Sequence, residues 1–301
     1  MKKVTTPEQV RKAINRAKEK GLSIGLVPTM GALHEGHESL VRMSLDETDF
    51  TAVSIFVNPV QFGPGEDLAA YPRSLDDDTL LLESLGVDLL FVPEVSSIYS
   101  GEEATEFLVK GLGDGLCGAS RPGHFHGVLL VVTKLFNMVR PDIGFFGQKD
   151  AQQAVIIQRM VTDLDFPVRI RLGSTVRETD GLAMSSRNAY LDAGERKSAA
   201  SLNGGLRLAF EKVKGGERDA DVIREIIRGS MESGGFDVDY CEVVSGMDLK
   251  RLERLEGTVL LAAAGRLGKT RLIDNISMRI TGDSVTEIVL EFPEWSRYEW
   301  E

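Results

Sequence analysis

The chain has 301 residues, of which 42% are hydrophobic and 27% are charged, and its formal net charge is −11. This length favours two domains, and the composition is that of an ordinary globular protein rather than a disordered or fibrous one. The acidic balance argues against broad binding to nucleic acid or to anionic membranes, because such partners usually require a basic face.

The first 175 residues alternate short apolar runs with helical patterns, which is typical of β-α-β units and a parallel sheet. The expected strands are residues 23–29, 50–57, 88–92 and 143–146. The expected helices are residues 38–45, 75–85, 128–139 and 151–161. We therefore expect an α/β domain over residues 1–175, with a Rossmann-like parallel sheet and helices on both faces.

Residues 176–301 have a different character and predict a smaller α+β domain. A polar, turn-rich stretch is followed by two helical patterns and then by two strand patterns, at residues 193–213, 220–232, 239–244 and 258–263. The tail beyond Asn275, through Trp295 and Trp300, has no pattern that we assign.

The N-terminus leads into a charged amphipathic stretch rather than a signal peptide, and no apolar run approaches the roughly 18 residues of a membrane-spanning helix. We therefore expect a cytoplasmic protein with no membrane partner. Cys117 and Cys241 are too few and too far apart in sequence to suggest a disulfide framework or a cysteine metal site.

All four histidines fall in two close pairs, His34 with His37 and His124 with His126. If a helix begins near Leu33, the first two imidazoles project from one face of its first turn, toward the crevice where such sheets bind ligands. A helix N-terminus favours phosphate. The alternatives are surface histidines near a helix cap, or zinc ligands, although the zinc-binding H-E-x-x-H pattern is one residue longer.

A second polar segment, residues 177–188, lies at the junction of the two expected domains. Ser185, Ser186 and Arg187 can donate several hydrogen bonds to a triphosphate, and a loop at a hinge can close over ATP. The alternative is a capped turn before residues 190–192, which serine and asparagine also suit.

Together these segments resemble known nucleotide-activating enzymes. Residues 34–37 are similar to the HxGH motif of the nucleotidyltransferase superfamily, and residues 184–187 to its KMSKS-type loop. Within that superfamily the chain resembles the pantothenate synthetase family over residues 27–37, 56–63, 121–125, 147–153, 175–188 and 270–275. Gln148 departs from the resemblance, since many family members have glutamate at this position.

The resemblance implies an ATP-dependent ligase in which the carboxylate of pantoate attacks the α-phosphate of ATP, and the amine of β-alanine then displaces AMP from pantoyl adenylate. It implies catalytic roles for His34, His37, Lys149, Ser185, Ser186 and Arg187. It implies that ATP also contacts Met30, Gly147, Asp150, Val176 and Met184, with Asp150 at the ribose. It implies pantoate contacts from Met30, Gln61 and Gln153, and a homodimer. It gives His124 and His126 no chemical role that we can derive.

Magnesium is expected to enter with ATP. The run Asp76 to Asp78 offers carboxylates, of which Asp77 and Asp78 are the candidate magnesium ligands. The alternative, which we favour, is that this run complements the dipole at the start of a helix.

Overall fold

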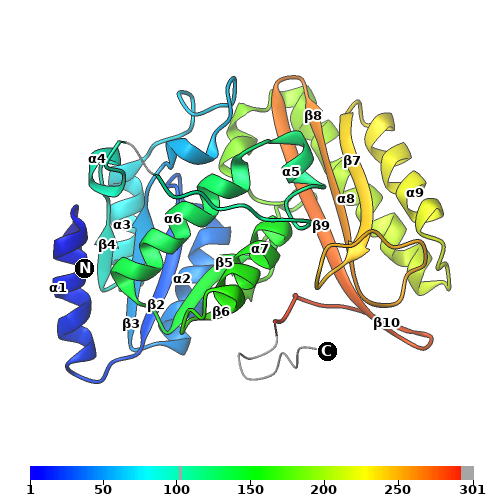
Figure 1. Cartoon of the computed structure of the whole chain (residues 1–301). Coiled ribbons are helices and arrows are strands. Elements are labelled where there is room, and N and C mark those ends of the chain that lie inside the picture. Colours follow the sequence, from blue (N-terminus) through cyan, green and yellow to red (C-terminus); the bar gives the residue numbers. More distant parts are fainter. Residues whose placement is uncertain (102–103, 293–301) are drawn as a thin grey trace.

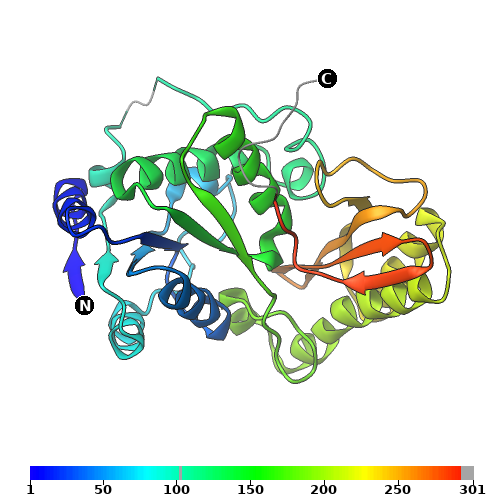
Figure 2. The ribbon, with the colours of Figure 1, turned by 90° about the horizontal axis from the view of Figure 1, so that it is seen from below.

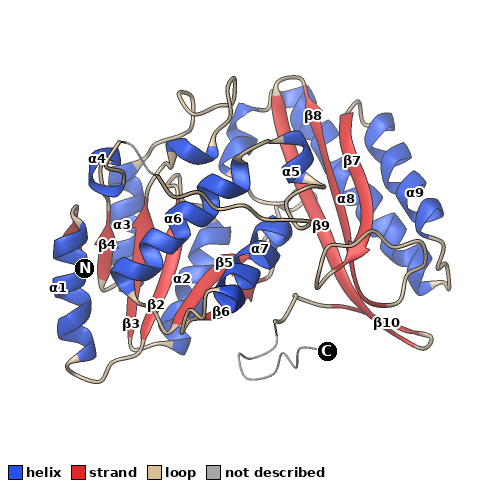
Figure 3. Cartoon of the chain, in the orientation of Figure 1, coloured by secondary structure: helices blue, strands red, loops and turns tan. Residues whose placement is uncertain are grey.

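The computed structural model describes residues 1–101 and 104–292, which form two sheets with helices packed around them (Figures 1 and 3). The first sheet has six strands in the order β1-β4-β3-β2-β5-β6, and all of its neighbouring pairs are parallel. The second has four strands in the antiparallel order β10-β9-β8-β7. The predicted parallel α/β sheet followed by a smaller α+β unit is confirmed.

The strand order of the first sheet reverses between β2 and β5. From β2 the chain steps to β3 and β4 in one direction, and later from β5 to β6 in the other. The strands are β1 (Lys2–Val4), β2 (Ile24–Thr29), β3 (Phe50–Ile55), β4 (Leu89–Phe91), β5 (Ile143–Gly147) and β6 (Arg169–Gly173). Ligands bind outside the carboxyl ends of the strands at such a reversal, so the segments after β2 and β5 hold the expected site.

Helices cover both faces of this sheet, as predicted (Figure 2). On one face α2 (Glu35–Glu47) and α3 (Leu75–Leu85) share a core with Val27 and Val53, and on the other α1 (Pro7–Lys18), α6 (His124–Val139) and α7 (Ala151–Asp163) pack with Leu26 and Ala52. Neighbouring strand residues face opposite cores because side chains alternate along a strand. Shorter pieces are η1 (Pro59–Gln61), α4 (Val95–Ile98), α5 (Cys117–Ser120) and η2 (Gln148–Asp150).

The second sheet packs on two partners, one on each face. Val243 and Leu261 join a core with helices α8 and α9, whereas their neighbours Val244 and Leu260 join the core of the first domain. The elements are η3 (Ser186–Tyr190), α8 (Ala193–Lys214), α9 (Ala220–Ser233), β7 (Asp237–Ser245), β8 (Gly257–Leu267), β9 (Thr270–Thr281) and β10 (Ser284–Glu287). The second domain is therefore held against the first by apolar burial.

The sequence prediction missed strands β1, β6, β9 and β10. In the edge strand β6, arginines alternate with apolar residues, and Arg169 and Arg171 pair with Glu47 of α2 at the sheet edge. In β9 the buried polar residues Asp274 and Asn275 interrupt the apolar pattern. The stretch beyond Asn275, to which the sequence assigned no pattern, forms the second half of β9 and then β10 as far as Glu287.

Residues 293–301, which include Trp295 and Trp300, lie outside the described residues. Across the described part of the chain, none of the helices has the length and apolar character needed to cross a membrane.

Candidate active site

The paired histidines follow β2 at the strand-order reversal. Helix α2 begins at Glu35, two residues later than the expected start near Leu33, so His34 is its N-cap and His37 its third residue. The two rings lie with their centroids 4.1 Å apart. The predicted juxtaposition of the two imidazoles is therefore present, although it arises from a cap and a first turn rather than from two helical positions.

Backbone amides fix the tautomers of both histidines. The Gly36 N–H donates to Nδ1 of His34 at 3.2 Å, and the His34 N–H donates to Nδ1 of His37 at 3.4 Å. A neutral imidazole whose Nδ1 accepts carries its proton on Nε2. Each ring therefore has an Nε2–H to donate to an oxygen in the crevice. In the described ranges no three His, Cys, Asp or Glu side chains are grouped to hold a metal ion.

Burial keeps both histidines neutral. Desolvation, with the nearby Lys149 charge, lowers the pKa of His34 from 6.5 to about 4. Desolvation, then the charges of His34 and Lys149, lowers the pKa of His37 to about 3. Near pH 7 the pair therefore acts through hydrogen bonds rather than through positive charge.

The backbone of Gly36, between the two histidines, lies close against the His34 ring. A Cβ on Gly36 would lie 2.9 Å from Cε1 and 3.0 Å from Nδ1 of His34. This close approach means that the absence of a side chain at Gly36 leaves space for the His34 ring.

The loop before α2 is held by Asp78 of α3. Gly31 and Ala32 have φ of 82° and 49°. The Asp78 carboxylate, 3% exposed, accepts the N–H groups of Ala32 and Leu33 at 2.9 and 2.8 Å and the hydroxyl of Ser74 at 3.1 Å. Asp78 therefore supports the histidine loop, a structural role that differs from the magnesium ligand considered above.

Lys149 lies in η2, directly after β5, and is half-buried. Its ammonium group makes no hydrogen bond or ion pair with any of the described residues. It is close enough to His34 and His37 to lower the pKa of both. A cation held without a counter-ion beside two N–H donors is suited to bind an anion.

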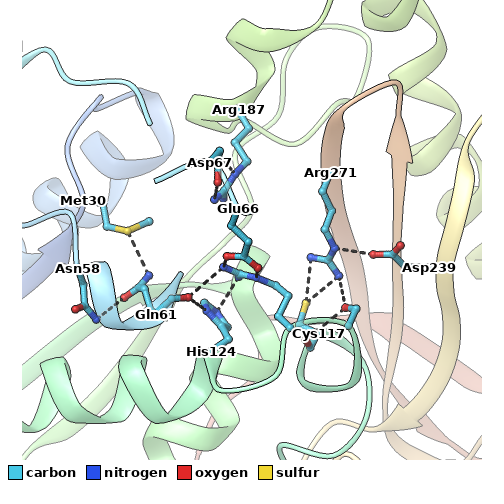
Figure 4. Close-up of polar contacts among 12 residues, drawn as sticks. Met30, Asn58, Gln61, Glu66, Asp67, Cys117, His124, Arg187, Asp239 and Arg271 are labelled. Atoms are coloured by element: carbon cyan, nitrogen blue, oxygen red, sulfur yellow. Dashed lines mark hydrogen bonds and ion pairs between the residues drawn. The ribbon is translucent and has the colours of Figure 1, made fainter. Parts of the chain in front are cut away.

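The Ser185–Arg187 segment reaches the same place from the interdomain side. Ser185 caps η3, the Ser186 hydroxyl lies 3.1 Å from that of Tyr71, and Arg187 donates to Asp67 at 2.8 and 2.9 Å. The Arg187 guanidinium also lies over the Tyr71 ring, 5.5 Å from its centroid. Figure 4 shows the Arg187–Asp67 pair next to Glu66. These contacts therefore hold the segment against the loop that follows η1.

These elements surround one cavity of about 220 Å³. All of the sequence-predicted site residues except Asp77 and Asp78 line it: Met30, His34, His37, Gln61, Gly147, Lys149, Asp150, Gln153, Val176, Met184, Ser185, Ser186 and Arg187. A larger cavity of about 830 Å³ continues toward β8 and β9 and shares Lys149, Asp150, Gln153, Ser185 and Arg187. Asp77 is instead exposed on α3.

One end of the cavity is lined by amides. The Gln61 Nε2 donates to the sulfur of Met30 at 3.2 Å, and its Oε1 accepts from Asn58 at 3.0 Å (Figure 4). Helix α6 fits tightly under this segment, because a Cβ on Gly127 would lie 2.5 Å from the backbone N of Gln61. Sequence reasoning did not select Asn58, although this residue lies within a segment that carries the resemblance.

No role for His124 follows from the sequence, and the structure places a partner on each side of its ring. Its Nδ1 donates to the carbonyl oxygen of Gln61 at 2.8 Å, and its Nε2 accepts from Arg121 at 3.0 Å. Arg121 also pairs with Glu66 at 2.7 Å. Desolvation, then the Arg121 charge, lowers the pKa of His124 to about 4. His126 lies apart and accepts the N–H of Phe107 at 3.0 Å.

The profile of the Pantoate-beta-alanine ligase family matches residues 2–277. The chain is 50% identical to the pantothenate synthetase of Moorella thermoacetica, with 93% of this chain and 99% of the relative covered. It is 47% identical to that of Clostridium botulinum strain Loch Maree, with 92% and 99% covered.

Two solved structures extend the comparison. Pantothenate synthetase from Thermus thermophilus has a TM-score of 0.87 at 42% identity, covering 91% of this chain and 98% of the other. A pantoate-beta-alanine ligase from Francisella tularensis, solved with β-γ ATP and β-alanine, has a TM-score of 0.77 at 35% identity, covering 91% and 97%.

Proposed function

The chain belongs to the pantoate-beta-alanine ligase family, and from this premise we propose how its cavity carries out the reaction. It is an ATP-dependent ligase that condenses pantoate with β-alanine to give pantothenate, AMP and pyrophosphate. The reaction runs through pantoyl adenylate. The task of the protein is therefore to align a carboxylate with the α-phosphate of ATP and to stabilise the charge that develops on phosphate oxygens.

His34, His37, Lys149 and the Ser185–Arg187 segment bind the phosphates in this proposal. The supporting observation is that these elements, far apart in sequence, line one cavity. The Nε2–H groups of the neutral histidines donate to phosphate oxygens, and Lys149 adds a charge that no described residue neutralises. Such donors are already in place before the negative charge develops, so they stabilise the transition state with little reorganisation.

Arg187 reaches ATP by exchanging partners. Its guanidinium is bonded to the Asp67 carboxylate, so phosphate oxygens must either replace that carboxylate or share the guanidinium with it. A bidentate arginine suits either acceptor. The Ser185 and Ser186 hydroxyls then add donors as the segment closes.

The amide end of the cavity binds pantoate in this proposal. Gln61 and Gln153 line the cavity, and each amide can both donate and accept, which suits a substrate that carries a carboxylate and hydroxyl groups. Met30 contacts Gln61 and gives this end an apolar wall. Gly147, Asp150, Val176 and Met184 bind the nucleoside part of ATP, with Asp150 at the ribose.

Magnesium enters with ATP in this proposal and is held by phosphate oxygens. Asp78 fits poorly as a ligand because its carboxylate accepts three hydrogen bonds, and Asp77 lies exposed on α3. We also propose a homodimer, a cytosolic location, and domains at residues 1–175 and 176–301. Of the second domain, residues 293–301 lie outside the described part.

The test is to separate the two half-reactions. With ATP, magnesium and pantoate alone, the protein releases one pyrophosphate per site and retains AMP as the adenylate, and AMP appears in solution once β-alanine is added. Light scattering measures the dimer. Pyrophosphate release without pantoate, or AMP retained in the final product, would refute the proposed reaction in favour of another adenylyl transfer.

A further inference from the structure

Residues 270–275 resemble a family motif, but the reaction proposed above gives these residues no chemical role. They form the first half of β9, which pairs with β8 on one side and β10 on the other. Within this stretch Asp274 and Asn275 are 3% and 5% exposed, although both are polar. Buried polar side chains cost free energy unless they are hydrogen-bonded, so their partners indicate what they do.

Asn275 holds the turn that carries Lys149. Its Nδ2 donates to the carbonyl oxygens of Gln148 at 3.0 Å and of Lys149 at 2.8 Å. Its Oδ1 accepts from the Gln148 side chain at 3.1 Å. The side chain of Lys149 is left free for a ligand while its backbone is fixed by a strand of the other domain.

Asp274 holds the base of the Ser185–Arg187 segment. Its carboxylate accepts from the Arg177 guanidinium at 2.6 and 3.0 Å and from Asn203 at 3.3 Å. The Arg177 guanidinium also donates to the carbonyl oxygen of Gly181 at 3.0 Å, and the Arg177 backbone forms an antiparallel β-bridge with Ala183. The same guanidinium therefore ties the turn before Met184 to β9.

Adjacent residues of a strand point to opposite sides, so one rigid strand can hold a different segment on each side. We propose that Asp274 and Asn275 are positioning residues that set the distance between Lys149 and the Ser185–Arg187 segment. This rests on the proposed role of both elements in binding the phosphates of ATP. Neither residue is catalytic, because each acts through a backbone or through Arg177.

The residue types fit this task. Two carbonyl oxygens meet the Asn275 amide nitrogen, and only a donor can satisfy them. A guanidinium meets the Asp274 carboxylate, whose side chain is 1% exposed, so a charged acceptor is needed there. Exchanging the two side chains would therefore leave both partners unsatisfied.

The experiment is a pair of double-mutant cycles. The first is read out as the single-turnover rate of pyrophosphate release, and the second as the steady-state KM for ATP and for pantoate. Asn275→Ala lowers the rate at least tenfold in the wild-type background but less than twofold in a Lys149→Ala background, because it acts through that lysine. Asp274→Asn raises the KM for ATP at least fivefold and leaves the KM for pantoate within twofold. In an Arg187→Ala background the same change has less than a twofold effect.

Met278→Ala is the matched control. Met278 lies on the same strand, is fully buried and belongs to the core of the second domain. The Met278→Ala variant has a lower melting temperature but an unchanged adenylation rate and unchanged KM values. If β9 affected activity only through its stability, this variant would lose activity as well. Asp274→Asn keeps the side-chain shape and carries the test if Asn275→Ala does not fold.

The inference is overturned if Asn275→Ala adenylates at the wild-type rate, if its effect is as large without Lys149, or if Met278→Ala loses as much activity. A wild-type rate in Lys149→Ala alone overturns the proposed role of that lysine and, with it, the cycle. If Lys149→Ala adenylates slowly and the effect of Asn275→Ala adds to it in full, the positioning role is rejected. The proposed role of Lys149 then still holds.

Discussion

Replacing Gly36 by alanine separates stability from activity at the histidine pair. The new Cβ would lie 2.9 Å from Cε1 and 3.0 Å from Nδ1 of His34, whereas ordinary contacts begin near 3.4 Å. The His34 ring must therefore move by about half an ångström, since a side chain gives way more easily than a helix. This movement stretches the Gly36 N–H to Nδ1 bond and turns Nε2 away from the proposed phosphate site.

The two effects of Gly36→Ala have different magnitudes. In a helix, alanine is about 1 kcal/mol more favourable than glycine, and an off-rotamer histidine costs about 0.5–1.5 kcal/mol, so the free energy of unfolding stays within about 1 kcal/mol of wild type. A misplacement of about 1 Å can lower a rate a hundredfold. A shift of half that size predicts an adenylation rate roughly tenfold or more below wild type.

The assay is single-turnover pyrophosphate release with saturating ATP and pantoate, beside urea unfolding of the same variant. Gly204→Ala is the control, because Gly204 is an exposed residue of α8 with nothing within 4 Å of its Cβ position. It gains stability without losing activity. A Gly36→Ala protein that adenylates like wild type would show that the orientation of His34 does not matter and would refute the reasoning.

Lys149→Met keeps most of the side-chain volume and removes the charge. It lowers the adenylation rate about a hundredfold with an unchanged melting temperature, and a wild-type rate would contradict its role. Gly127→Ala places a Cβ 2.5 Å from the backbone of Gln61, where nothing can give way easily. This variant has a raised KM for pantoate, and its free energy of unfolding in urea is about 1–3 kcal/mol lower. A wild-type KM would show that Gln61 does not bind pantoate. The pKa of His37 is about 3 in the folded protein against 6.5, so its stabilising effect is full above pH 6.5 and is lost as the pH falls toward 3. The contribution of this residue to the free energy of unfolding then falls by at most about 1.4 kcal/mol per pH unit. Between pH 6.5 and 4.5 the free energy of unfolding of His37→Asn therefore depends less steeply on pH than that of the wild type. Equal slopes would mean that the pKa of His37 is normal.

The sequence predicted the elements whose signal lies within a short stretch. The strand before His34 and the helix at Leu75–Leu85 follow from apolar periodicity, and the latter has the predicted bounds. The ends of β2 and β5 were recognised as places for chemistry because parallel strands direct their carboxyl ends to one edge. Residue chemistry at those ends, with the resemblance, then selected side chains that line one cavity.

Strands whose apolar pattern is interrupted could not be recognised in this way. In β9 the buried side chains of Asp274 and Asn275 bond to residues 71 to 127 positions away, so no local window contains the reason for their burial. The same holds for Asp78, whose partners Ala32 and Leu33 lie some 45 positions earlier. A run of three aspartates at a helix start indicates dipole complementation and does not indicate a loop support.

The sequence by itself predicted the parallel sheet, the two-part architecture and a set of polar residues that line one cavity. Only the tertiary structure decided the protonation and direction of these groups, such as the Nε2–H tautomer of His34, the Lys149 ammonium that no described residue pairs, and the Asp67 partner of Arg187. The physical reason is that periodicity and capping are local properties of the chain. Burial and hydrogen-bond pairing exist only after distant segments have packed together.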